Sequence, residues 1–233
     1  MLTMKKKISL LFLLLISLSS YGQDTEPHDI GAWYMYFFNT KFKNSNFGIQ
    51  GDFQHRNWNV LGDLEQLLLR SGVTYNPKNT NVVLTLGFAN ITTGQLGESN
   101  ETVNENRIYQ EALLPQKVGE RIYLTHRFRY EQRFVDDQDF RTRYRYNLFM
   151  NIPLNKKTLT KNAIYAAFYN ELFINGERNI GNDRRVPLFD RNRVYLGLGC
   201  GITDKLRVQG GFMNQSTENN SKNQMQLSLH HTF

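Results

Sequence analysis

A charged residue recurs at every second position in two adjacent stretches of the sequence, HRFRYEQRF at 126–134 and RTRYR at 141–145, and all of these residues except Glu131 are arginines. A period of two is the repeat of a β-strand, so each stretch would place its charges on one face of a sheet. That face carries Arg127, Arg129, Glu131, Arg133, Arg141, Arg143 and Arg145. A guanidinium group keeps its proton in proteins, and its planar fork binds carboxylates and phosphates through paired hydrogen bonds. The chemistry open to this face is therefore anion binding, with either the protein's own carboxylates or a ligand as the anion.

The two stretches are close enough in sequence to form a hairpin. If residues 135–139 close it, Glu131 lies opposite Arg143 and Arg129 lies opposite Arg145. Like charges directly opposite each other destabilise a sheet, so further acids are expected nearby.

Glu111 and Glu171 are the expected additional acids, one on each flanking strand. A register that pairs residue 152 with residue 164 would set Glu171 opposite Arg145. Two interpretations stay open for the six arginines and three glutamates of this cluster. Either the ion pairs and bound water fill an interior and hold the strands in register, or the excess positive charge lines a small-anion pore or a site for an anionic ligand.

A hydrolytic alternative comes from Ser228 and His230, which share one strand face near the end of the chain. A nucleophile needs a base within hydrogen-bond reach and a group that orients this base. Residues two apart on a strand are about 7 Å apart, and the sequence has no Gly-x-Ser-x-Gly motif. No catalytic residue is assigned, so a lipid hydrolase is retained only as an alternative.

No cofactor or metal is predicted. Cys200 is the only cysteine, which excludes an internal disulfide and any zinc or iron–sulfur site that needs two thiolates.

The elements that would position these residues are β-strands. Alternation of period two recurs from residue 30 to the end, and no window keeps apolar residues at helical spacing for long. Eleven runs stand out: 30–38, 47–58, 64–75, 82–92, 107–114, 121–134, 140–153, 163–174, 191–202, 206–214 and 224–233. The prediction is an all-β, antiparallel up-and-down barrel of 10–12 strands, with an even number expected for an outer-membrane barrel.

A membrane environment is the expected surrounding of this barrel. Many runs have ten or more residues, enough for a tilted strand to cross about 25 Å of hydrocarbon. Short lysine-bearing connections also alternate with mostly longer and more acidic ones, such as 175–190. A secreted soluble barrel or sandwich that acts as a binding module is the alternative, because such a protein would also alternate apolar and polar residues.

The first 22 residues read as an export signal. Three lysines precede an apolar run at 8–18, which is too short to span a bilayer as a helix. We expect a signal peptide at 1–22 and a barrel domain at 23–233. Loss of the three lysines lowers the formal net charge from +7 to +4, and an exported chain of this kind is not expected to bind nucleic acid.

The C-terminal strand, QMQLSLHHTF, ends on Phe233 at an outward apolar position. A terminal aromatic residue on an amphipathic strand is typical of the signal read by the barrel assembly machinery. The expected partners are therefore that machinery and outer-membrane lipids, and the expected location is the bacterial outer membrane. The sequence does not indicate an oligomeric state.

The segments ENRIYQEALLPQKVGERIYLTHRFRYEQRF and RTRYRYNLFMNIPL, together with the opening DIGAW, resemble a bacterial family of uncharacterised proteins, domain-of-unknown-function family 2490. The resemblance covers nearly the whole of 23–233. It implies an outer-membrane barrel and carries over no activity and no catalytic residue.

Overall fold

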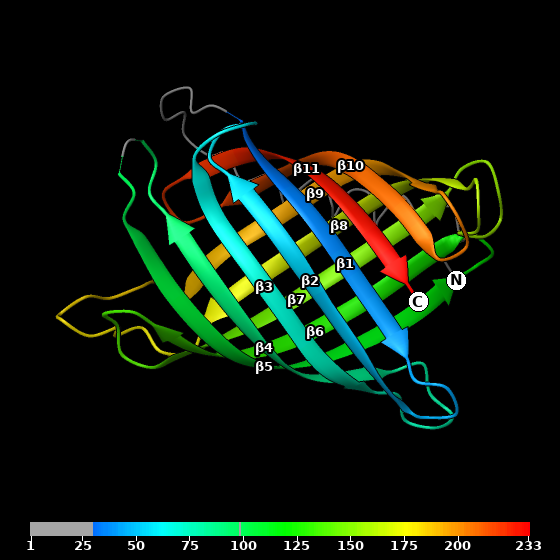
Figure 1. The fold of residues 1–233 in the computed structure, drawn as a ribbon, viewed down its shortest axis with the longest axis horizontal. Helices are drawn as coiled ribbons and strands as arrows, with labels where there is room; N and C mark the ends of the chain where they lie inside the picture. Colours follow the sequence, from blue (N-terminus) through cyan, green and yellow to red (C-terminus); the bar gives the residue numbers. More distant parts are fainter. Residues whose placement is uncertain (1–29, 98) are drawn as a thin grey trace, which may run out of the picture.

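The computed structural model describes residues 30–97 and 99–233, and every regular element in that part of the chain is a β-strand (Figure 1). The predicted signal peptide lies outside the described residues. The strands are β1 (Gly31–Lys41), β2 (Phe47–Asn57), β3 (Leu64–Tyr75), β4 (Val83–Gly94), β5 (Thr102–Val118), β6 (Ile122–Val135), β7 (Arg141–Pro153), β8 (Ile164–Asn175), β9 (Phe189–Gly201), β10 (Leu206–Ser216) and β11 (Ser221–Thr232). In the described residues, no helix is long and apolar enough to cross a membrane.

The strands form one closed barrel in which each strand pairs with its neighbours in sequence. All of these sequential pairs are antiparallel, but β1 and β11 close the barrel in parallel and lie side by side in Figure 1. The predicted all-β barrel of 10–12 strands is confirmed, whereas the expectations of an even number and of antiparallel pairing throughout are wrong. Strand direction reverses at each turn, so in an odd-numbered barrel the first and last strands run the same way.

The parallel seam places the start of β1 and the end of β11 at opposite ends of the barrel. Gly31 pairs with Gln224, and Asn39 pairs with Thr232, so both strands run toward the C-terminal Phe233. We call this end, which also carries the 119–121 turn, the turn end. The opposite end, which carries the 176–188 connection, is the loop end.

β5 is the longest strand, with 17 residues, and it extends well beyond the predicted run at both of its ends. Residues 102–104, which lie between the predicted runs 82–92 and 107–114, instead pair with β4, and Val118 pairs with Ile122 in β6. Gly119, at a φ of +61°, takes the left-handed conformation that the tight turn needs. The length difference between the two sets of connections is consequently smaller than predicted.

The outer face of the barrel is apolar. Large apolar side chains point outward along the middle of many strands, with exposures of 61% for Leu86, 67% for Leu196, 60% for Leu198 and 62% for Phe212. Residues on alternate positions of the same strands point inward and are mostly polar or charged. The barrel thus has the reverse of the polar-outside pattern of a water-soluble protein.

Aromatic side chains pack inside the wall on the side of β1 and β8–β11. Trp33, Tyr165, Tyr195 and Met213 are buried there in one cluster. Gly199, directly opposite Tyr165, leaves no room for a Cβ atom beneath the tyrosine ring. The glycine-rich GLGCG segment therefore allows bulky rings to lie flat against the inner wall.

Candidate functional site: an arginine-rich lumen

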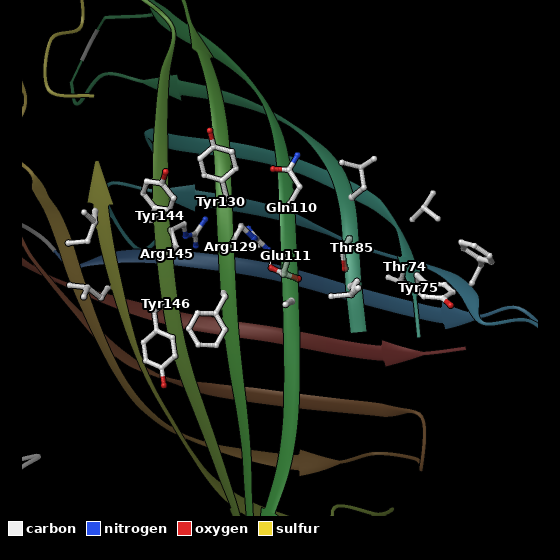
Figure 2. Close-up of a pocket in the computed structure, with 18 residues that line it drawn as sticks. Thr74, Tyr75, Thr85, Gln110, Glu111, Arg129, Tyr130, Tyr144, Arg145 and Tyr146 are labelled. Atoms are coloured by element: carbon white, nitrogen blue, oxygen red, sulfur yellow. Dashed lines mark hydrogen bonds and ion pairs between the residues drawn. The ribbon is translucent and has the colours of Figure 1, made fainter. Parts of the chain in front are cut away.

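The nine charged residues singled out in the sequence all point into the barrel from β5, β6, β7 and β8. They are Glu111, Arg127, Arg129, Glu131, Arg133, Arg141, Arg143, Arg145 and Glu171. Eight of them are buried, with exposures between 1% for Glu131 and 8% for Arg141, and the Arg127 side chain is 13% exposed. Figure 2 shows Glu111, Arg129 and Arg145 at one level on three neighbouring strands.

The predicted hairpin register of β6 and β7 is confirmed. Glu131 lies opposite Arg143, and Arg129 lies opposite Arg145. Glu171, in contrast, lies opposite Asn147 rather than Arg145, so the predicted register of β7 and β8 is wrong by two residues.

The two-residue offset arises where β7 meets β8, because Pro153 pairs with Tyr165 at the turn end. A shift of two keeps every side chain on its expected face. Arg145 therefore still reaches Glu171 diagonally, and its Nη2 lies 2.5 Å from Oε1 of that glutamate.

Glu131 is the centre of the charge network. Its carboxylate oxygens accept hydrogen bonds from Arg145 Nη1 at 2.6 Å and from Arg143 Nη2 at 2.7 Å. Arg107 and Arg129 approach the same carboxylate at 3.5 and 3.8 Å. One buried negative charge thus neutralises part of the charge of four guanidinium groups from three strands.

Glu111 and Glu171 extend the network toward the turn end. Glu111 accepts a hydrogen bond from Arg129 at 2.6 Å and one from the Gln50 amide at 2.8 Å. Glu171 accepts hydrogen bonds from Arg127 at 2.6 Å and from Arg145 at 2.9 Å. Because charged hydrogen bonds of this length are among the strongest in proteins, the network ties β2 and β5–β8 together across the interior.

Glu105 is a member of the network that the sequence analysis missed. Its two oxygens accept hydrogen bonds from Arg107 at 2.6 and 2.7 Å, and Arg133 bonds to the same carboxylate. Arg107 is the first residue of the predicted run 107–114, and Glu105 continues the same inward alternation two residues before that run begins. The signal was therefore present, but Glu105 fell outside every predicted run.

Two further acids were also missed. Asp52 on β2 binds Arg70 on β3 through both carboxylate oxygens, at 2.8 and 2.9 Å. Asp190, at the start of β9, accepts a hydrogen bond from Arg143 at 2.8 Å. Neither stretch shows the dense arginine repeat that drew attention to β6 and β7.

Aromatic faces take the place of carboxylates for some of the arginines. The Arg56 guanidinium lies 3.7 Å from the centre of the Trp33 ring, and Arg193 approaches the same ring at 4.8 Å. Phe173 contacts Arg145 at 4.5 Å and Arg193 at 4.7 Å. The buried arginines outnumber the buried carboxylates, so carboxylates alone cannot balance every guanidinium charge. Cation–π contacts add to the stabilisation of these desolvated groups.

Two cavities lie within the lumen of the described barrel. One, of about 350 Å³, opens toward the turn end, and the other, of about 290 Å³, lies toward the loop end. Four arginines line both cavities: Arg56, Arg70, Arg145 and Arg193. These four residues, which we call the arginine belt, form the boundary between the two halves of the lumen.

The 176–188 connection folds against the wall at the loop end. Thr142 of β7 donates to the Glu177 carboxylate through its backbone N–H and, at 2.7 Å, through its hydroxyl group. Slight desolvation acts to raise the pKa of Glu177, which is largely exposed, but these hydrogen bonds hold that pKa below the ordinary value of a glutamate. The backbone N–H of Asp139 also donates to Ile180 O at 3.0 Å, which joins the two connections above the loop-end cavity.

Ser228 and His230 are closer together than strand geometry alone suggested. The Ser228 hydroxyl lies 3.0 Å from His230 Nε2, and the imidazole stacks on Phe37 at a centroid distance of 4.9 Å. Among the residues described, no carboxylate forms an ion pair with this histidine, so the third member of a catalytic triad is missing. The pair also faces the lumen, away from the outer surface where a lipid substrate would lie.

A separate hollow of about 800 Å³ lies on the outer face of β3–β8. Exposed apolar side chains dominate its lining, including Val73, Leu86 and Phe128. In Figure 2, Tyr144, Tyr130 and Gln110 form a row beside the row of charged residues. The hollow is part of the apolar exterior, and its lining also includes Glu111, Arg129 and Arg145 of the charge network.

Comparison with known proteins places the chain in a family without an assigned activity. Residues 30–226 match the model of a family described as a protein of unknown function, DUF2490. The chain belongs to this family. An uncharacterised protein of Methylorubrum extorquens is 31% identical over 179 residues, which cover 73% of this chain and 74% of that protein. No match to a solved structure was found.

Proposed function

We propose that the protein is an integral outer-membrane β-barrel whose arginine–carboxylate network holds a narrow lumen closed. The observation that carries the proposal is the inverted distribution of side chains, with apolar residues exposed on the outside and ion pairs buried within. All eleven strands have at least 11 residues, which meets the length of about 9–11 residues that crosses a bilayer. The closed barrel also leaves no unpaired strand edge, as hydrocarbon requires.

The interior supports a structural role for the network. A porin interior is a water-filled channel, whereas here arginines from β2, β3, β7 and β9 separate the two cavities. Each central carboxylate bridges at least two strands, so the network specifies strand register as well as filling space. A secreted soluble barrel would instead have to keep Leu196 and Phe212 in water, at exposures of 67% and 62%.

The membrane assignment is tested with Leu196→Arg, which places a charge near the middle of β9. If this position faces hydrocarbon, folding into phospholipid vesicles should be less favourable by about 2–4 kcal/mol. Leu61→Arg is the matched control, because Leu61 lies in the β2–β3 connection at 82% exposure. This substitution should change the free energy of folding into vesicles by less than about 1 kcal/mol.

Urea titration in vesicles measures the free energy of folding, and the migration of unboiled and boiled samples on a gel shows whether the barrel has folded. Faster migration of the unboiled wild type and a selective cost of Leu196→Arg support the proposal. Equal behaviour of the two variants, together with a folded protein that stays in the aqueous phase without detergent, would show a soluble barrel.

A second candidate function is conduction of small anions, and the arginine belt is the observation that favours it. Rings of arginine or lysine select anions in known pores. In planar bilayers with a salt gradient, a conducting barrel would give a reversal potential that favours anions, and Arg193→Gln would reduce that preference. A current no larger than the background would eliminate conduction and leave the structural role.

A further inference from the structure

Arg141, the first residue of β7, stands apart from the ion-pair network. Its side chain points into the loop end of the lumen, and the residue is 8% exposed. Unlike the other arginines of β6 and β7, it forms no ion pair with a carboxylate of the described residues, and its Nε has no hydrogen-bond partner there. A buried guanidinium group without an anion is costly unless something else supplies the negative charge.

The strand register explains why Arg141 is unpaired. Arg107, Arg133 and Arg141 lie directly opposite one another across β5, β6 and β7. Glu105 is bound by Arg107 and Arg133, which leaves the third arginine of this row without a partner. Three like charges in one row repel each other. The row therefore carries excess positive charge, which a bound anion would neutralise.

The cavity beside Arg141 has room for a ligand. It measures about 290 Å³, and its lining includes Arg141, Arg191 and Gln138. Arg191 Nε is also buried and without a hydrogen-bond partner among the described residues, while Arg191 Nη2 pairs with Asp190 at 3.0 Å. Gln138 Oε1 has no partner there either, but it is an acceptor and would bind a water or a hydroxyl group of the ligand rather than an anion oxygen. Since one water takes up about 30 Å³ of liquid volume, the space holds a small polar molecule with several waters.

We propose that this cavity binds a small oxyanion, a phosphate or a carboxylate, held between Arg141 and Arg191. Oxygen acceptors of this kind match the planar fork of arginine, and the bound charge would neutralise the Arg107–Arg133–Arg141 row. The two donors come from β7 and β9, with β8 between them, so the ligand would bridge non-adjacent strands. The inference deepens the anion-binding alternative by locating one site, and it needs neither conduction nor a membrane.

Calorimetric titration of the full-length folded barrel in detergent micelles tests the site, with inorganic phosphate as the probe and ionic strength held constant with chloride. Parallel titrations with sulfate and succinate determine which oxyanion binds best. Arg141→Gln should weaken phosphate binding at least tenfold. The matched control is Arg207→Gln, an arginine that lines only the turn-end cavity and should leave the affinity unchanged.

The stability of wild type and variant, measured without phosphate, separates a loss of binding from misfolding. Arg141→Gln removes an unpaired buried charge, so its midpoint of unfolding should equal or exceed that of the wild type. Wild type that binds no phosphate up to about 10 mM, ten times the dissociation constant of a weak 1 mM complex, would overturn the proposal. Equal weakening by Arg141→Gln and Arg207→Gln would also overturn it, because the effect would then reflect the general charge of the lumen. Failure of the vesicle assay with Leu196→Arg would leave this result unaffected.

Discussion

Replacing Glu131 by glutamine should cause the largest loss of stability of any single change in the lumen. The side chain keeps its size and shape but loses the charge that faces Arg145 at 2.6 Å, Arg143 at 2.7 Å, Arg107 at 3.5 Å and Arg129 at 3.8 Å. Glutamine can accept a hydrogen bond through its oxygen, but its NH₂ group would point a donor at an arginine that is itself only a donor.

The expected cost follows from the burial of this site. Glu131 is 1% exposed, so water cannot replace the lost carboxylate. Removing one partner of a buried ion pair costs about 3–5 kcal/mol, because the remaining charge is left uncompensated. Most proteins have a total stability of about 5–15 kcal/mol, so Glu131→Gln should remove a large share of it.

The assay is equilibrium unfolding in detergent micelles, followed by the fluorescence of Trp33 and Trp58, the two tryptophans of the chain. Glu120→Gln is the control, because Glu120 pairs with Lys157 at 3.0 Å with side-chain exposures of 73% and 70%. An exposed pair of this kind contributes about 0–1 kcal/mol. If Glu131→Gln costs no more than Glu120→Gln, the network does not hold the barrel together and the structural role is refuted.

Two further substitutions test the packing of the lumen. Trp33→Phe removes the hydrogen bond from the indole Nε1 to Glu65, which measures 3.2 Å, and should cost about 1–3 kcal/mol because a buried carboxylate loses a donor. Circular dichroism during denaturant titration measures this loss without relying on the missing tryptophan. Gly199→Ala would push a methyl group into the Tyr165 ring and should cost about 1–3 kcal/mol in the same assay. Gly210→Ala, whose nearest contact would be 3.7 Å away, should change stability by less than about 0.5 kcal/mol, and an equal effect of both alanines would contradict the packing argument.

Much of the lumen chemistry follows from local sequence. Arginines and Glu131 at alternate positions of 126–134 and 141–145 define an inward face, and the short 136–140 connection leaves little freedom in the hairpin register. Glu131 and Arg143 therefore pair as predicted. The longer 154–163 connection allows several registers, and the prediction that Glu171 lies opposite Arg145 was accordingly wrong by two residues.

The partners contributed by distant strands could not be derived in the same way. Asp190 binds Arg143 from a strand that is not its neighbour, and Arg56 on β2 and Arg193 on β9 both contact the Trp33 ring. Such contacts depend on the diameter and tilt of the closed barrel. Alternation within a strand specifies which face a residue occupies, but not which residue lies across the lumen.

The sequence by itself determined the fold class, the inward charged face, the apolar outer face and the family, because all of these are recorded in local periodicity and in contiguous segments. Only the tertiary structure decided the parallel closure of β1 on β11, the arginine belt and the unpaired Arg141 at the loop end. Each of these depends on how the two ends of the sheet meet. Closure brings together side chains that no run of sequence places side by side, and it thereby determines which buried charges find a partner.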